Sequence, residues 1–228
     1  MRTIVRATFV MQRVSPGAPS LENVELVRCR FDNCHALASR RPGDRWLIRN
    51  VRLTRCVEHS CSLNTTALED VAVEGLKHEG RSLPFLWCCV FRHVTLTGRI
   101  AAPKVNEAGF NWTDDLSRQW LHANEEYYAG VDWALDLRGA TFSTFFTLPG
   151  VPADLVRRDP TTQFVLRRER VMAYQRPPDQ ARTIADIVID NLVASGLPDV
   201  VVVTGQGSRK FAEHLRVMEE LREAGVAE

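Results

Sequence analysis

The chain repeats part of its own sequence at an offset of 27 residues. The segment at 23–29 reads Asn-Val-Glu-Leu-Val-Arg-Cys and the segment at 50–56 reads Asn-Val-Arg-Leu-Thr-Arg-Cys, so five of seven positions are identical. Shorter copies begin 20 residues later at Asp70 and a further 23 residues later at His93. Repeats of this length are typical of solenoids, whose stacked turns bury their apolar surface together. The repeat therefore constrains architecture more than activity.

Apolar residues inside each copy recur with a finer period of five. Two apolar residues flank one outward residue, as Val24 and Leu26 do, and two more polar residues then follow. This period fits neither a helix nor a long strand, but it fits a short strand step followed by a corner. Four such sides make a square turn of 20 residues, which is the spacing from Val51 to Val71. The side chains expected to stack in buried columns are Leu26, Phe31, Leu53, Val73, Phe91 and Leu96.

The same pattern resembles the pentapeptide-repeat family. It is carried by the stretches at 24–34, 89–98 and 135–142, where small residues or Cys and then Leu or Phe occupy two inward positions. The resemblance covers roughly residues 20–100 and 131–146, and it implies a mainly β fold, a right-handed parallel quadrilateral β-helix. Some members of that family resemble duplex DNA and inhibit topoisomerases through a strongly acidic, regular rod. The near-neutral, interrupted repeat body of this chain departs from that pattern, which favours another kind of partner.

Composition narrows the environment of the chain. Among 228 residues, 29 Lys and Arg against 28 Asp and Glu leave a net charge of +1, so no global field recruits nucleic acid or an anionic membrane. No apolar run approaches the about 20 residues that span a bilayer, and arginines interrupt the first 13 residues, which makes them a poor signal peptide. The alternation there predicts an opening strand. We expect a cytoplasmic protein.

Six cysteines could indicate disulfide bonds or a metal site. Cys-x4-Cys occurs twice, with His35 and His59 nearby, but zinc-binding pairs are usually two to four residues apart. We expect free thiols that pack as small apolar residues, and neither a metal nor another cofactor. Cys88 breaks the pattern and is expected to face outward. The five that occupy the small inward position are Cys29, Cys34, Cys56, Cys61 and Cys89.

The five-residue pattern is interrupted once before it ends. Residues 103–130 lack it, and Thr113 followed by two acidic residues predicts the start of a helix, so we expect a helical insert near 111–128. The pattern then resumes and ends before a candidate strand at 163–171. The β-prone run at 200–203 is expected to pair with that strand or to extend a sheet across a dimer.

The last 50 residues differ in character from the repeat body. A proline-rich linker at 176–179 separates a first domain, 1–178, from a second, 179–228, which is predicted to be an α/β appendage of helix, strand and helix. Asp179 is expected to cap the first helix and Ser208 the last. The segment is predicted to cap the repeat body or to mediate association through an apolar helix face. That face comprises Phe211, Leu215, Met218 and Leu221.

A turn before the last helix has the outline of a phosphate-binding loop. Gly-Gln-Gly-Ser-Arg-Lys at 205–210 follows a strand and precedes a helix, an order that directs backbone N–H groups toward an anion. The Walker spacing and the third glycine of a dinucleotide motif are absent, so an ordinary tight turn with a helix cap is the other interpretation. The candidate cofactor-binding residues are Gly205, Gly207, Ser208 and Lys210.

Two further groups of charged residues are binding candidates. Asp114, Asp115 and His122 share the predicted helix, but chemistry there needs a third partner and a pocket, and a solvated helix face is the alternative. Arginines recur at equivalent points of successive copies and could form a basic stripe, although acidic residues interleave. Those arginines are Arg28, Arg49, Arg52, Arg55, Arg92 and Arg99.

No nucleophile motif and no metalloprotease motif occurs, and a β-helix presents broad faces without a preformed cleft. The sequence therefore favours a noncatalytic protein-interaction module, such as a scaffold, an adaptor or an immunity-type partner. We expect a protein partner, with self-association left open, and neither a membrane nor a nucleic-acid partner. The alternative is an enzyme or nucleotide-binding protein whose site lies between the repeat body and the glycine turn at 205–210.

Overall fold

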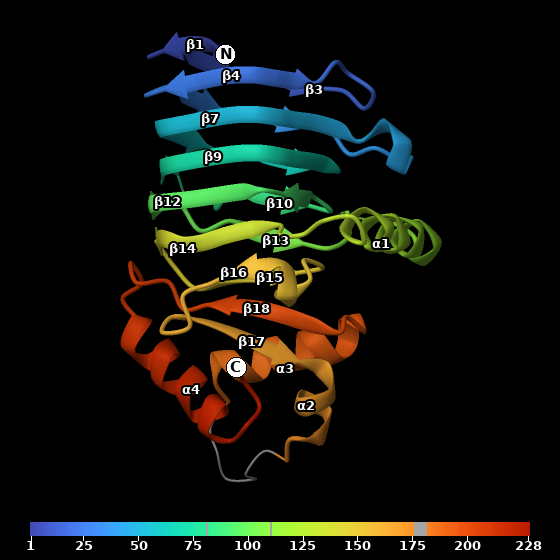
Figure 1. Ribbon diagram of the computed structural model, residues 1–228, viewed down its shortest axis with the longest axis vertical. Coiled ribbons are helices and arrows are strands. Elements are labelled where there is room, and N and C mark those ends of the chain that lie inside the picture. The colour runs from blue at the N-terminus through green and yellow to red at the C-terminus, as the bar shows by residue number, and fades with distance from the viewer. Residues whose placement is uncertain (81, 110, 176–181) are drawn as a thin grey trace.

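The computed structural model describes residues 1–80, 82–109, 111–175 and 182–228. It is mainly β, with long parallel sheets consistent with a parallel β-helix-like fold (Figure 1). Successive segments of the chain form successive layers of strands, and we call each layer a rung. The main path of the largest sheet runs through β1 (Arg2–Val5), β4 (Leu21–Val27), β7 (Trp46–His59), β9 (Thr66–His78), β12 (Val94–Ile100), β14 (Leu135–Phe142) and β16 (Val156–Arg157).

A second parallel sheet and three short strands complete the rungs. Its strands are β3 (Arg13–Val14), β6 (His35–Ala36), β8 (Ser62–Asn64), β10 (Phe85–Trp87) and β13 (Lys104–Asn106). The short strands of the first sheet are β2 (Thr8–Val10), β5 (Arg30–Asp32) and β11 (Val90–Arg92), and short 3-10 turns lie at Pro42–Asp44 and Ala153–Leu155. The first rung, residues 2–14, comprises β1, β2 and β3, and the second comprises β4, β5 and β6.

The sequence repeat is the pairing register of the largest sheet. Val24 pairs with Val51 and Leu26 with Leu53, which is the offset of 27 residues. Val51 pairs in turn with Val71, at an offset of 20. Because neighbouring strands lie about 4.8 Å apart, equivalent positions of the repeat stack on one another.

Corner residues with a left-handed backbone explain the period of five. Positive φ angles recur at every fifth residue from Asn50 to Gly80. Residues other than glycine adopt this conformation at roughly 1–2 kcal/mol each, so the corners persist only because the stack fixes them. The residue after most of these corners is buried, as Val51 is after Asn50 and Cys56 is after Arg55. The non-glycine corners of this run are Asn50 (51°), Arg55 (53°), Ser60 (54°), Thr65 (45°) and Asp70 (54°).

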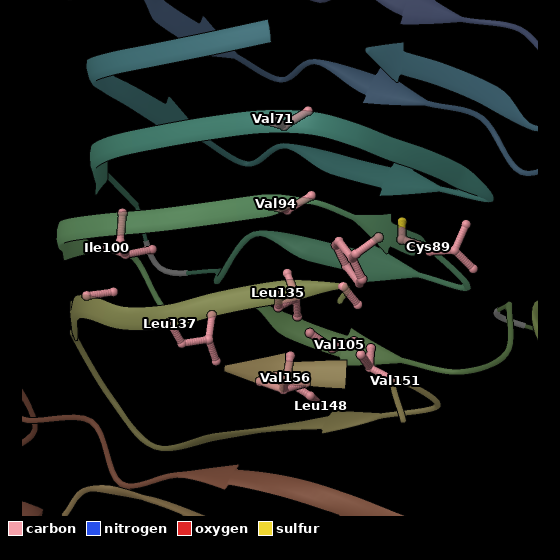
Figure 2. Close-up of a cluster of buried hydrophobic side chains, with 14 of the residues drawn as sticks. Val71, Cys89, Val94, Ile100, Val105, Leu135, Leu137, Leu148, Val151 and Val156 are labelled. Atoms are coloured by element: carbon pink, nitrogen blue, oxygen red, sulfur yellow. The ribbon is translucent and has the colours of Figure 1, made fainter. Parts of the chain in front are cut away.

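The main core lies inside the rungs. Of the predicted column residues, Leu26 and Phe91 are buried, at 5% and 3% exposed. Figure 2 follows the core through Val71, Val94 and Leu135, which come from β9, β12 and β14. The remaining column residues are partly buried and pack against this cluster; they are Phe31, Leu53, Val73 and Leu96.

Helix α1 (Asp114–Tyr128) follows β13 and lies beside the rungs (Figure 1). The hydroxyl of the predicted cap, Thr113, accepts a hydrogen bond from a first-turn N–H at 3.3 Å. Trp120 is fully buried, and the guanidinium of Arg45 lies 4.7 Å from its ring centre. Arg45 also donates to Asn124 Oδ1 at 2.7 Å. These contacts hold α1 against the repeat body.

An antiparallel sheet and three helices occupy the end opposite the first rung (Figure 1). In this sheet β18 pairs with both β15 and β17, which confirms the predicted pairing of the 163–171 and 200–203 runs. The strand at 163 ends at Arg167 because a helix begins there. Two of the three strands precede residue 179, so the sheet spans the predicted domain boundary. The elements are β15 (Phe146–Pro149), β17 (Gln163–Arg167), α2 (Arg168–Ala173), α3 (Ile184–Ser195), β18 (Asp199–Val203) and α4 (Phe211–Glu223).

The helix caps differ from those predicted. Asp179 and the linker at 176–179 lie outside the described residues. Helix α3 begins after Thr183, which forms a capping box with Asp186. The prediction that Ser208 caps the last helix is wrong, since α4 begins after Lys210. The Ser208 hydroxyl accepts the Lys210 N–H at 3.1 Å, so it serves the turn before the helix.

Candidate interaction surface

The first rung ends the stack of parallel strands and, among the described residues, has no strand on its outer side (top of Figure 1). β1 pairs with β4, β2 with β5 and β3 with β6. No other strand in the described part of the chain pairs with any of the three. A strand in a parallel sheet directs alternate backbone groups to its two sides. The outward N–H and C=O groups of residues 2–14 therefore form an open edge.

Exposed apolar side chains gather at this edge. Met1, Val5, Val10 and Met11 are 62%, 57%, 50% and 61% exposed. They make up half of the eight large apolar side chains that are exposed in the described residues. Single exposed apolar residues need no explanation, but a group of them on an open edge is typical of an interaction surface. The inward residues of the same rung are only half-buried because no rung covers them; they are Ile4, Ala7, Phe9 and Val14.

The first rung is also basic. Residues 1–21 contain Arg2, Arg6 and Arg13 and no Asp or Glu. All three arginines are exposed, and none forms an ion pair within the described chain. Burial, and then the charge of Arg13, lowers the pKa of His35 in the second rung. The edge therefore presents uncompensated positive charge.

Arg2 has a particular place in this rung. It lies in register with Val24, which lies in register with Val51. Both valines are buried, so Arg2 stands at the end of a column that is apolar in the following rungs. Its charge remains in water because no strand lies on its outer side among the described residues.

Farther along the stack, charges of opposite sign alternate from rung to rung. Glu22 pairs in register with Arg49, Arg49 with Glu69, and Glu69 with Arg92. Glu69 is only 5% exposed, and it accepts hydrogen bonds from Arg49 Nη2 at 2.8 Å, Arg92 Nη2 at 2.5 Å and the Tyr127 hydroxyl at 3.1 Å. Two arginines of the predicted basic stripe thus neutralise a buried carboxylate and do not form a free basic surface.

Two other arginines of that stripe continue a corner that starts at the open edge. Arg6, Arg28 and Arg55 are exposed, all with φ of 53°, and the strand registers place them at the same corner of successive rungs. Arg52 lies opposite an acidic residue of β4 in register. Of the predicted stripe, Arg28 and Arg55 therefore continue the free basic surface of the first rung, whereas Arg99 is exposed elsewhere, in β12.

Sequence reasoning missed a polar pair inside the rungs. Glu58 lies in register with Phe31 on one side and with His78 on the other. It is 4% exposed, forms a hydrogen bond with His78 Nδ1, and accepts the Cys61 N–H at 3.3 Å. His78 Nε2 is buried and has no hydrogen-bond partner in the described chain. The rungs can therefore hold an inward acid when the next rung supplies a partner.

The inward thiols donate to backbone carbonyls of the preceding rung, as Cys29 and Cys56 do at 3.5 and 3.3 Å. All six cysteines are free. Cys88 is 1% exposed because α1 covers it, with Asn124 Nδ2 donating to its sulfur at 3.6 Å. Burial raises the pKa of Cys88 to about 11 and that of Cys89 to about 12. No group of three or more His, Cys, Asp or Glu suited to a metal occurs among the described residues.

The predicted glycine turn packs against the segment at 142–144. Gly205 has φ of 62°, and a Cβ there would lie 2.1 Å from a backbone carbonyl of that segment. The Gly207 N–H donates to another carbonyl of the segment at 2.8 Å, and the Ser208 N–H donates to Gly205 at 3.0 Å. The Lys210 N–H is bonded to the Ser208 hydroxyl. These donors are engaged within the chain, and packing accounts for both glycines.

Two hollows flank the C-terminal sheet. One of about 770 Å³ is lined by Gln206 and Gly207 of the glycine turn, with Arg99 and His78 from the rungs. The other, of about 630 Å³, is mainly apolar and lies between α3 and the strands β13 and β15. Anion binding at the glycine turn itself stays a prediction.

The predicted interaction face of α4 is used within the chain. Met218 and Leu221 are buried in the C-terminal core, and Leu215 packs against it. Phe211 is partly exposed. The face of α4 is therefore largely unavailable to a partner.

The candidate acid–base residues of α1 lie on an exposed helix face. Asp115 pairs with Arg118, and His122 pairs with both Glu125 and Glu126.

No protein-family model, no curated protein and no solved structure matches this chain. None of the helices in the described residues is long and apolar enough to cross a membrane.

Proposed function

We propose that this chain is a noncatalytic protein-interaction module built on a right-handed quadrilateral β-helix of the pentapeptide-repeat type. Left-handed corners at every fifth residue support that architecture. The role is that of a scaffold, an adaptor or an immunity-type partner. The observation that carries the proposal is the open, partly apolar outer edge of residues 2–14, at the end of the stack that no C-terminal element covers.

The open edge supports binding by strand addition. A partner strand gains main-chain hydrogen bonds along the edge and apolar contacts with Val5 and Val10. The nucleotide-binding alternative has weaker support, because the N–H groups of Gly207, Ser208 and Lys210 in the glycine turn already have acceptors. The C-terminal sheet then has a structural role, in which it covers the other end of the stack.

Site-specific photo-crosslinking in the native host tests this proposal. A photo-reactive phenylalanine analogue is placed at Met11 in one variant and at Met172 in another, since both side chains are 61% exposed. We expect one protein adduct of defined mass from position 11 and none from position 172. The adduct is then remade from the two purified proteins. Adducts of equal yield from both positions, or none from position 11, would refute the proposal.

A further inference from the structure

We propose that the occupant of the first rung is an extended, acidic segment of a partner protein, which adds as a parallel strand and places a carboxylate over Arg2. This inference rests on the proposed function and specifies the chemistry of the partner. It starts from the position of Arg2 at the end of the column that continues through the buried Val24 and Val51.

An added strand changes the surroundings of Arg2. In the present structure its guanidinium is exposed. A strand hydrogen-bonded to the outer edge of β1 lies about 4.8 Å away and covers the end of this column. A buried guanidinium without a partner is strongly unfavourable, whereas one bonded to a carboxylate is tolerated. The strand that fits therefore carries Asp or Glu at the position stacked on Arg2.

The chain contains one inward acid that pairs with a basic residue of the next rung, and it already places a strand with acidic residues beside β1. The inward Glu58 is held by His78 of the next rung, at adjacent positions of one column. Strand β4 occupies the other edge of β1. There Glu25 lies in register with Thr3, and Glu25 Oε2 accepts a hydrogen bond from the Thr3 hydroxyl at 3.1 Å. An acidic strand is thus already the neighbour of β1 on its inner side.

The rest of the first rung has the same preference. Arg6 and Arg13 add positive charge on either side of the half-buried Phe9, with no acidic residue before Glu22. A second copy of the chain, stacked edge to edge, would bring together two edges that each carry three arginines and no acidic residue. Like charges brought together at an interface disfavour binding. Charge complementarity therefore favours an acidic partner over a second copy.

Register specifies a short pattern for the partner strand. Ile4 follows Arg2 by two residues and faces the same way, in register with Leu26. A parallel strand consequently needs an acidic residue, any residue, and then an apolar residue, so that the carboxylate covers Arg2 and the apolar side chain covers Ile4. The segment at 22–24 of the chain, Glu-Asn-Val, has this pattern.

A peptide with the sequence of residues 20–27, blocked at both ends, serves as the probe. Binding to the full chain is measured by fluorescence anisotropy, and hydrogen–deuterium exchange locates it. We expect slowed exchange at residues 2–14 and binding about thirtyfold weaker for the same peptide with both Glu changed to Gln. Higher salt should weaken the binding of the acidic peptide but not that of the peptide with Gln.

A charge swap is the decisive comparison. The Arg2→Glu variant should bind the acidic peptide more weakly. It should instead bind the peptide in which both Glu are changed to Lys. Arg99→Glu is the matched control, because Arg99 is exposed, forms no ion pair within the described chain and lies far from the first rung. Equal binding of acidic, neutral and basic peptides would overturn this inference while leaving the proposed function intact, provided the position-11 adduct forms.

Two other outcomes also overturn it. Light scattering measures the oligomeric state of the parent chain and of the Arg2→Glu variant. Dimers of equal stability in both would identify a second copy as the occupant. A short DNA duplex that protects residues 2–14 more strongly than the peptide would identify a nucleic acid. If neither the peptide nor the adduct at position 11 is observed, both this inference and the proposed function fail.

Discussion

The first rung and the C-terminal sheet both terminate the same stack of strands, but only the second buries its apolar surface. Phe164, Leu166 and Val202 in the C-terminal sheet are fully buried beneath helices. Ile4 and Phe9 hold inward positions in the first rung and are only half-buried. Since an uncovered end invites association, the difference separates a structural end from a binding end.

The same substitution at the two ends gives the largest expected contrast. Phe164→Ala removes a fully buried ring that also lies 4.2 Å from the Arg222 guanidinium, and it should lower the free energy of unfolding by about 3–5 kcal/mol. Phe9→Ala removes a half-buried ring that stacks on Phe31 at 5.3 Å, so the loss should be about 1–2 kcal/mol. Urea denaturation measures both. Equal losses would contradict the division between ends.

The second contrast compares a charged residue inside a column of the stack with one at its open end. Glu58→Leu removes the buried carboxylate that accepts from His78 Nδ1 and should lower the free energy of unfolding by about 2 kcal/mol. Arg2→Leu changes an exposed residue at the open end and should alter it by less than about 0.5 kcal/mol.

The double variant Glu58→Leu with His78→Leu is the control for this contrast. It removes both polar groups together, so it should recover part of the loss. A double variant less stable than Glu58→Leu alone would mean that the two side chains contribute independently.

The sequence allowed prediction of the rungs because their physical cause is periodic. Corner residues such as Asn50 and Arg55 recur at a fixed spacing, and the residue that follows each of them points inward. The Glu58–His78 pair was missed because an inward polar residue resembles an outward one in sequence. The position of Glu58 within the five-residue pattern was the one feature of the sequence that indicated an inward side chain.

The candidate site was less predictable, because an open edge is defined by a missing neighbour. Three arginines and no acid in residues 1–21 were visible in the sequence, but their meaning depends on the register of Arg2 with Val24. The apolar face of α4 could be predicted, whereas its use inside the chain could not. Any amphipathic helix can face a core or a partner, and Met218 faces the core.

The third prediction concerns pH and the thiols. Burial raises the pKa of Cys88 to about 11 and that of Cys89 to about 12 in the folded chain, whereas an unfolded thiol has a pKa of 9.0. Above pH 9 the unfolded state releases protons that the folded state keeps, so stability falls between about pH 9 and 12. The expected loss is about 1.4 kcal/mol per thiol at pH 10.

Urea denaturation at pH 8 and pH 10 checks this, with Cys88→Ala and Cys89→Ala as variants that should each reduce the loss.

The thiols also compare the first rung with the interior of the stack. Cys34 lies under the first rung, where it donates to the Phe9 carbonyl at 3.4 Å. Local opening of that rung should let Cys34 react with an alkylating reagent well before Cys89 does. Simultaneous labelling would mean that the first rung opens only with the whole chain.

The smallest expected effect distinguishes a corner occupied by arginine from one occupied by aspartate. Arg28 lies between Arg6 and Arg55, all exposed and with φ of 53°. Arg28→Gly removes the cost of a left-handed side-chain residue and some like-charge repulsion, so it should raise the free energy of unfolding by about 0.5–1 kcal/mol, more at low salt. Asp70→Gly gives the same backbone relief at another corner but removes the acceptor that His93 Nδ1 contacts at 3.0 Å.

The pKa of His93 is raised first by its hydrogen bond to Asp132 and then by Asp70, so the protonated imidazole favours the folded chain. That contribution is present below the unfolded pKa and is lost as pH rises through the folded pKa. Asp70→Gly should therefore gain less than Arg28→Gly, with the gap widest at acidic pH. Thermal melts at pH 5.5 and pH 8 compare the two. An equal gain at both corners and at both pH values would mean that backbone relief alone decides corner stability, and that the basic corner beside the open end carries no electrostatic strain for an acidic partner to relieve.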